Sequence, residues 1–86
     1  MHVVRAAKRY RVLLQGRIVL GPERSLACTV LDLSWCGAKI RVAPEVGLPD
    51  VFPLVIAAED LRTVTVHLRW RRGDLAGVAF DAGRRG

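Results

Sequence analysis

A strict alternation of apolar and polar side chains runs through residues 61–72, LRTVTVHLRWRR. One parity holds Val64, Val66, Leu68 and Trp70, and the other holds Thr65, His67, Arg69 and Arg71. A period of two places alternate side chains on opposite faces of a β-strand and does not fit an amphipathic helix. The pattern therefore predicts a strand whose first set is buried and whose second set faces solvent.

The same kind of pattern predicts five more strands, over Tyr10–Leu20, Leu26–Leu33, Ala38–Val42, Val51–Ala57 and Leu75–Phe80. In the first of these, the core-facing residues are expected to be Val12, Leu14, Ile18 and Leu20. Pro53 cannot donate a ladder hydrogen bond, which predicts an edge or bulged strand over Val51–Ala57. The pair Gly73-Asp74 predicts a two-residue hairpin turn of type II′.

Short strands without helical periodicity in a chain of 86 residues predict a single all-β domain. Closing the sheet on itself removes unpaired edges. We therefore expect a small six-stranded antiparallel β-barrel over residues 10–81. A flexible basic arm is expected over residues 1–9 and a frayed tail over residues 82–86.

The net charge of +6 favours an anionic partner, such as a nucleic acid, a nucleotide or a membrane surface, although charge of this size also serves solubility. Arg5, Lys8, Arg9 and Arg11 crowd the first eleven residues, where there is no acid. No apolar run is long enough to span a bilayer, and the N-terminus has no signal-peptide pattern. We expect a soluble, cytoplasmic protein without membrane insertion.

Enzymatic and metal chemistry find little support in the sequence. Cys28, Cys36, His2 and His67 lack the close spacing of zinc ligands, and Cys28 is expected to pack as a small hydrophobic residue. Ser34 lacks the preceding glycine of a nucleophile elbow, and no carboxylate pair has acid/base spacing. We therefore expect neither an enzyme nor a bound metal or cofactor.

The segment DLSWCG, residues 32–37, has the spacing D-x-S-x-x-G between two predicted strands. Asp32 and Ser34 are residue types that bond backbone groups two residues on, and Gly37 would permit a positive φ. Turn chemistry alone can explain the three residues.

Taken with Arg5 and Arg9, which form R-x-x-x-R one predicted hairpin earlier, the segment resembles the signature of the PilZ domain. The stretch RWRRGDLAGVAF, residues 69–80, is similar to the C-terminal pattern of that family. The resemblance covers residues 5–81. It implies a bacterial, non-enzymatic receptor for the second messenger cyclic di-GMP. The implied ligand-binding residues are Arg5, Arg9, Asp32, Ser34 and Gly37, and the candidates for further contacts are Lys8, Tyr10 and Trp35.

The residue types suit this ligand. Arginine forks bind phosphate oxygens and the O6 and N7 acceptors of guanine. A carboxylate such as that of Asp32 accepts from the N1–H and N2–H₂ edge of guanine, which adenine does not present. The resemblance implies that the arm folds over a ligand resting on the turn over residues 32–37 and passes the signal to an unidentified downstream protein. Trp35 is expected to plug the barrel mouth, to stack on a base or to crowd the ligand.

Two alternatives remain open. A small basic barrel could bind RNA or DNA through an outward face holding Lys39, Arg41, His67, Arg69 and Arg71. Such a binder also needs exposed aromatic residues for stacking. With Trp70 and Phe80 expected inward and Phe52 unassigned, only Tyr10 and Trp35 are available. The second alternative is a degenerate PilZ fold that binds a protein and no nucleotide.

Overall fold

The computed structural model, which describes residues 9–81, contains six β-strands and no helix within that range. The strands are β1 (Tyr10–Gly21), β2 (Arg24–Leu33), β3 (Gly37–Arg41), β4 (Val51–Ala57), β5 (Leu61–Arg72) and β6 (Leu75–Phe80). Each lies where alternation or a short apolar run between turn residues predicts it. Accordingly, no helix in this part of the chain is long and apolar enough to cross a bilayer.

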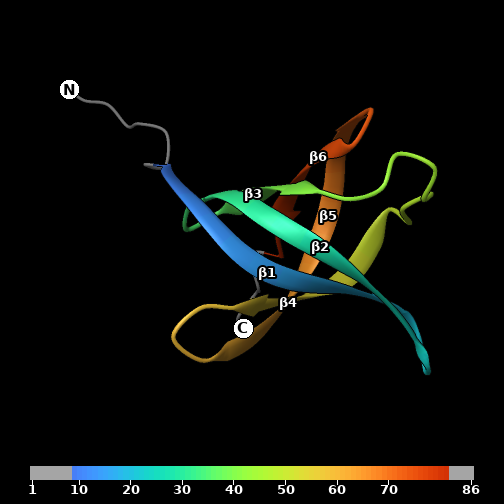
Figure 1. Ribbon diagram of the computed structural model, residues 1–86, viewed down its shortest axis with the longest axis horizontal. Helices are drawn as coiled ribbons and strands as arrows, with labels where there is room; N and C mark the ends of the chain where they lie inside the picture. The colour runs from blue at the N-terminus through green and yellow to red at the C-terminus, as the bar shows by residue number, and fades with distance from the viewer. Residues whose placement is uncertain (1–8, 82–86) are drawn as a thin grey trace.

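The strands form one closed antiparallel barrel in the order β1-β2-β3-β6-β5-β4 (Figure 1). Four of the six neighbouring pairs are consecutive in sequence or joined by a hairpin, and the loop over residues 42–50 carries the chain from β3 to β4. The barrel closes where Gln15–Ile18 of β1 pairs with Leu54–Ala57 of β4. The predicted six-stranded antiparallel barrel is confirmed.

The expectation that β4 is an edge or bulged strand is wrong, because β4 pairs with β1 on one side and, without a register shift, with β5 on the other. Pro53 nevertheless lies at a position where its nitrogen does not have to donate a ladder hydrogen bond. The pairing with β1 ends at Leu54, so Pro53 is paired only with Thr65 of β5. A proline can occupy this position because no neighbouring strand calls for its missing N–H.

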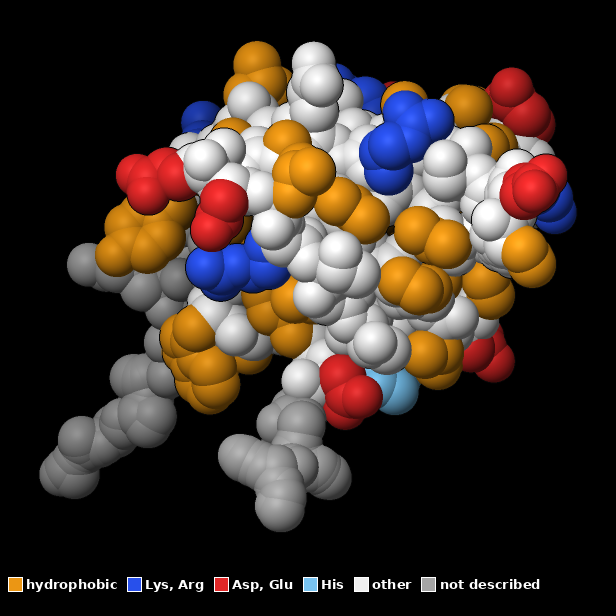
Figure 2. Space-filling model, turned by 90° about the horizontal axis from the view of Figure 1, so that it is seen from below, with side chains coloured by type: hydrophobic (Ala, Val, Ile, Leu, Met, Phe, Trp, Pro, Cys, Tyr) orange, Lys and Arg blue, Asp and Glu red, His pale blue; other side chains and the backbone are white. Residues whose placement is uncertain are grey.

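The outer surface carries charges of both signs. On the face shown in Figure 2, basic and acidic side chains lie in separate small groups among apolar ones, and no continuous basic patch covers it. The coloured side chains on this side of the barrel thus have mixed charge.

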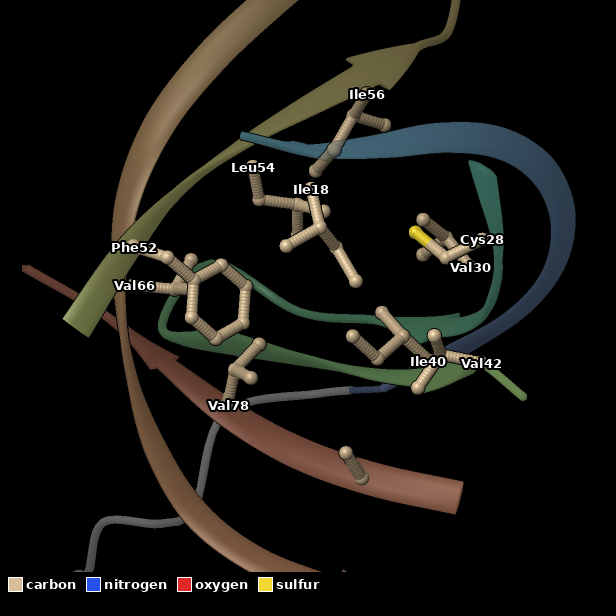
Figure 3. Close-up of a cluster of buried hydrophobic side chains, with 11 residues drawn as sticks. Ile18, Cys28, Val30, Ile40, Val42, Phe52, Leu54, Ile56, Val66 and Val78 are labelled. Atoms are coloured by element: carbon tan, nitrogen blue, oxygen red, sulfur yellow. The ribbon is translucent and has the colours of Figure 1, made fainter. Parts of the chain in front are cut away.

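The barrel interior is filled by apolar side chains that converge from all six strands (Figure 3). The fully enclosed large side chains are Ile18, Val30, Ile40, Phe52, Leu54 and Val66. Val12, Leu14 and Leu20 of β1 pack against this cluster, as the alternation predicts. No polar or charged side chain between residues 9 and 81 is buried. The described interior is therefore an apolar core.

Cys28 belongs to the core, as expected for a small hydrophobic residue, and is 8% exposed. Burial raises the pKa of its thiol to about 11, with a smaller opposing effect from the charge of Arg17. The thiol is therefore protonated at neutral pH, and a protonated thiol is a poor nucleophile and metal ligand.

Two strands break their alternation at an irregularity in the pairing. In β2 the break lies between Val30 and Asp32, and in β5 it lies between Leu68 and Trp70. A β-bulge inserts a residue and turns the following side chain to the other face. The expectation that Trp70 is buried in the core is therefore wrong: its side chain lies outside the barrel and is 40% exposed, whereas Val66 is fully buried.

The break in β5 also changes the direction of Arg71, which was expected on the outer face and instead turns toward the loop after β3. Its guanidinium donates to the carbonyl oxygens of Ala43 at 2.9 Å, Val46 at 2.8 Å and Gly73 at 2.9 Å. It thereby ties the loop after β3 to the β5–β6 hairpin. That hairpin turn has a positive φ of 58° at Gly73 and none at Asp74, which agrees with the predicted type II′ geometry.

Replacing Leu54 with alanine should lower the free energy of unfolding by about 2–5 kcal/mol, because Leu54 is fully enclosed and its loss leaves a cavity. Leu61 is a matched control, because the same side chain is 75% exposed there and Leu61→Ala should change stability by less than about 0.5 kcal/mol. Urea unfolding of the two variants measures both values. Equal losses would contradict the assignment of the core.

Candidate functional site

A row of cross-strand neighbours lies on the outer face of the barrel. Asp32 of β2 is paired with Lys39 of β3, Lys39 with Gly77 of β6, and Gly77 with Trp70 of β5. Neighbouring strands are about 4.8 Å apart, so the two ends of the row are separated by about 14 Å. The row therefore places a carboxylate and an indole at opposite ends of one surface, with an ammonium group between them.

This row forms the floor of a cavity of about 410 Å³ on the outside of the barrel. Its polar and aromatic lining residues are Arg9, Asp32, Ser34, Cys36, Lys39, Arg69 and Trp70. The remaining lining is contributed by small or apolar residues of β3 and β6, including Gly37 and Gly77. Of the ligand-binding residues that the sequence predicts, Arg9, Asp32, Ser34 and Gly37 are thus brought together at one cavity.

The position of Trp70 depends on the absence of a side chain at Gly77. A Cβ at Gly77 would overlap the indole Nε1 and Cε2 of Trp70, so the ring occupies the space directly above the glycine backbone. One side of the indole is supported in this way, and the side chain remains 40% exposed. A partly exposed aromatic ring that packs against a strand can serve as a platform for a planar base.

Asp32 has a carboxylate oxygen, Oδ1, that is buried and has no hydrogen-bond partner among the described residues. Arg11 and Lys39 lie opposite Asp32 on the two neighbouring strands, yet neither forms an ion pair with it. A buried polar atom without a partner costs free energy, typically about 1–3 kcal/mol. Asp32 thus lines the cavity with one carboxylate oxygen that no described residue engages.

The hydroxyl of Ser34 is engaged inside the turn between β2 and β3. It accepts hydrogen bonds from the backbone N–H groups of Gly37 at 3.1 Å and Cys36 at 3.3 Å, and it donates to the carbonyl oxygen of Gly37 at 3.3 Å. The Ser34 N–H also donates to that carbonyl, at 2.9 Å. This side chain holds the shape of the turn.

Gly37 does not have the positive φ that the sequence permits, since Gly73 alone has one among the described glycines. Its requirement is steric: a Cβ at Gly37 would overlap the carbonyl oxygen of Val78 on β6. The glycine therefore allows β3 and β6 to approach closely at the edge of the cavity.

The remaining predicted residues are distributed differently. Arg5 and Lys8 lie outside the described residues, so the R-x-x-x-R motif is represented at the cavity by Arg9. Tyr10 and Trp35 are 59% and 81% exposed and do not line the cavity. The expectation that Trp35 plugs the barrel mouth is wrong, because the turn carries it outward into solvent.

Sequence reasoning missed four polar or aromatic lining residues as parts of this site, Cys36, Lys39, Arg69 and Trp70. Lys39 and Arg69 were expected on the outer face of the barrel. That outward direction was the one signal in the sequence that could have assigned them to an outer cavity. Trp70 was assigned to the core because the alternation of β5 was extended through the irregularity after Leu68. Nothing in the pattern of apolar residues marks that extra residue.

A second cavity, of about 470 Å³, is lined by residues of β1, β2, β4 and β5. Its lining includes Cys28, Val55, Ala57 and Leu61, with Arg17 as the one charged residue. It lacks the combination of an unused carboxylate, an indole and several cations that marks the first cavity. Between residues 9 and 81, no group of histidine, cysteine, aspartate and glutamate side chains could hold a metal ion.

The sequence was compared with families and proteins of known function. No curated protein matches it. The sequence profile of the PilZ domain matches residues 4–85, nearly the whole chain. That span contains both motifs, the six strands and every residue of the outer cavity. The chain therefore belongs to the PilZ domain family, whose members include non-enzymatic receptors for the bacterial second messenger cyclic di-GMP.

Proposed function

We propose that this protein binds cyclic di-GMP in the outer cavity, in the bacterial cytoplasm, and acts as a receptor without catalytic activity. The observation that carries the proposal is the buried, unpartnered Oδ1 atom of Asp32. The N1–H and N2–H₂ groups of a guanine would supply the hydrogen bonds that this carboxylate lacks. The ligand thereby relieves a cost that is already present in the free protein.

The cations around the cavity suit the phosphates of this ligand. Arg9, Lys39 and Arg69 all line the cavity, and no hydrogen bond or ion pair between described residues engages their side chains. Charge-assisted hydrogen bonds from such groups to phosphate oxygens are among the stronger ones in proteins. In the proposed complex these residues, joined by Arg5 of the N-terminal motif, neutralise the two phosphates.

The turn over residues 32–37 supports the ligand, and the indole of Trp70 stacks against a base at the other end of the row. Ser34 and Gly37 contribute by holding the turn and by keeping β3 close to β6. Lys8, Tyr10 and Trp35 are proposed to make contacts only once the N-terminal segment lies over the ligand. The signal then passes to a downstream protein through that segment.

One observation favours a second candidate, the binding of single-stranded RNA or DNA. Trp70 lies outward, so the exposed aromatic residues are Tyr10, Trp35 and Trp70 rather than two. Against this, two cations of the proposed basic face are engaged within the protein. Arg41 pairs with Asp74 at 3.3 Å, and Arg71 binds backbone carbonyls. The acid at one end of the row, Asp32, also opposes a polyanion.

The substitution Asp32→Ala separates these two functions by the sign of its effect. If Asp32 binds guanine, the variant should lose cyclic di-GMP affinity worth about 1.5–3 kcal/mol, although it becomes more positive. Arg9→Ala should lose a similar amount. For a binder that depends on charge alone, removing an acid should leave affinity for nucleic acid unchanged or improve it, with steep salt dependence.

Calorimetry of wild type and both variants against cyclic di-GMP, GTP and a short single-stranded oligonucleotide measures these differences. Wild type should prefer cyclic di-GMP to GTP. Undiminished binding of the dinucleotide by Asp32→Ala would show that the carboxylate has no role. A wild type that binds the oligonucleotide and ignores the dinucleotide would establish the second candidate.

The stacking role of Trp70 is tested by closing the space beneath it. Gly77→Ala should push the indole away from β6, because the new Cβ would overlap the ring. Loss of one stacked base costs about 1–3 kcal/mol of binding free energy. Gly47→Ala is the matched control, since nothing lies within 4 Å of a Cβ there. Titration with cyclic di-GMP should show weaker binding for Gly77→Ala alone, and unchanged affinity would contradict the stacking role.

The proposed role of residues 1–9 is tested by hydrogen exchange measured with and without cyclic di-GMP. If Arg5 and Arg9 close over the ligand, amide exchange in this segment should slow on binding, while amides in the core strands change little. Arg5→Ala should remove the effect in the N-terminal segment. Exchange that is the same in both states would mean that the segment does not take part.

A further inference from the structure

Arg72 lies beside the outer cavity without belonging to its lining. It follows Trp70 by two residues on β5, so both side chains share the outer face, and it is exposed. Its guanidinium carbon lies 5.8 Å from the centroid of the Trp70 ring. The guanidinium forms no ion pair within residues 9–81. In the free protein an arginine thus lies over the ring of the proposed stacking platform, with its donors unused by any described carboxylate.

The two ends of the row present opposite hydrogen-bonding groups. Asp32 offers acceptors, which match the N1–H and N2–H₂ edge of guanine. Arg72, beside the indole at the other end of the row, offers paired donors, which match the O6 and N7 acceptors on the other edge of guanine. The two bases of cyclic di-GMP are chemically identical, yet they would meet two different sets of protein groups.

We propose that Arg72 is a specificity-determining residue, which reads O6 and N7 of the guanine stacked on Trp70 while Asp32 reads the other guanine. This inference rests on the proposed binding of cyclic di-GMP. Binding moves the guanidinium from the ring of Trp70 to the edge of the base. Adenine is rejected at this end because its N6 amino group places a donor where guanine has the O6 acceptor, opposite the arginine donors.

This arrangement has a consequence for mixed dinucleotides. The cyclic dinucleotide with one guanine and one adenine can place its guanine at either end, so its adenine always meets one of the two readers. Wild type should therefore bind it less well than cyclic di-GMP. Once Arg72 is removed, the guanine can go to Asp32 and the adenine to Trp70 without penalty.

The experiment compares wild type, Arg72→Ala, Arg72→Lys and Arg62→Ala in calorimetric titrations with cyclic di-GMP, cyclic GMP-AMP and cyclic di-AMP. Wild type should prefer cyclic di-GMP to cyclic GMP-AMP by roughly 5- to 150-fold, the range for one bidentate arginine–guanine pair. Arg72→Ala should bring this preference close to one while still rejecting cyclic di-AMP through Asp32. Arg72→Lys keeps the charge but not the fork, so it should also lose the preference.

Arg62→Ala is the matched control, because Arg62 is an exposed arginine of the same strand that does not line the cavity. It should keep the wild-type preference. If Arg72→Ala weakens all three ligands equally and lysine restores them, Arg72 acts only through charge and the inference is wrong. Tighter binding by Arg72→Ala would also overturn it, since the arginine would then merely compete for the ring. A wild type that binds no cyclic dinucleotide would instead overturn the proposed function itself.

Discussion

The extra residue in β5 between Leu68 and Trp70 is the constraint on which the outer cavity depends. Before it, Val64, Val66 and Leu68 face the core, and Val66 is fully buried. After it, Trp70 lies against the bare backbone of Gly77, and Arg71 turns toward the loop carbonyls. The irregularity in β2 does the same for Asp32 at the other end of the row. Without these two breaks, the indole and the carboxylate would both point into an apolar interior.

The barrel itself could be predicted from the sequence because its determinants are periodic or local. Alternation shows which residues of β1 and β5 face inward as far as each strand is regular. The dipeptide Gly73-Asp74 is sufficient to predict the type of the hairpin turn that it forms. The position of Pro53 was a partial success. The sequence shows that Pro53 lacks an N–H. It does not show whether the whole strand lies at an edge or, as in β4, only its first residues lack a partner on one side.

The candidate site was predictable where a motif identifies residues and unpredictable where the site depends on register. Arg9, Asp32, Ser34 and Gly37 were found from spacing, and all four lie at the cavity. Trp70 was missed because one inserted residue reverses the direction of every side chain after it. The role of Gly37 was also misjudged, since the need for a small residue comes from Val78 on a distant strand.

The apolar interior also has an evolutionary consequence. Because no polar side chain between residues 9 and 81 is buried, the core is built from apolar residues, of which Val78 alone also lines the cavity. Substitutions at Asp32, Lys39 or Arg69 leave the core packing intact. Selection on ligand binding and selection on folding therefore act on almost separate sets of positions. A barrel of this kind can change its ligand, or lose it, in single steps that each leave a folded protein.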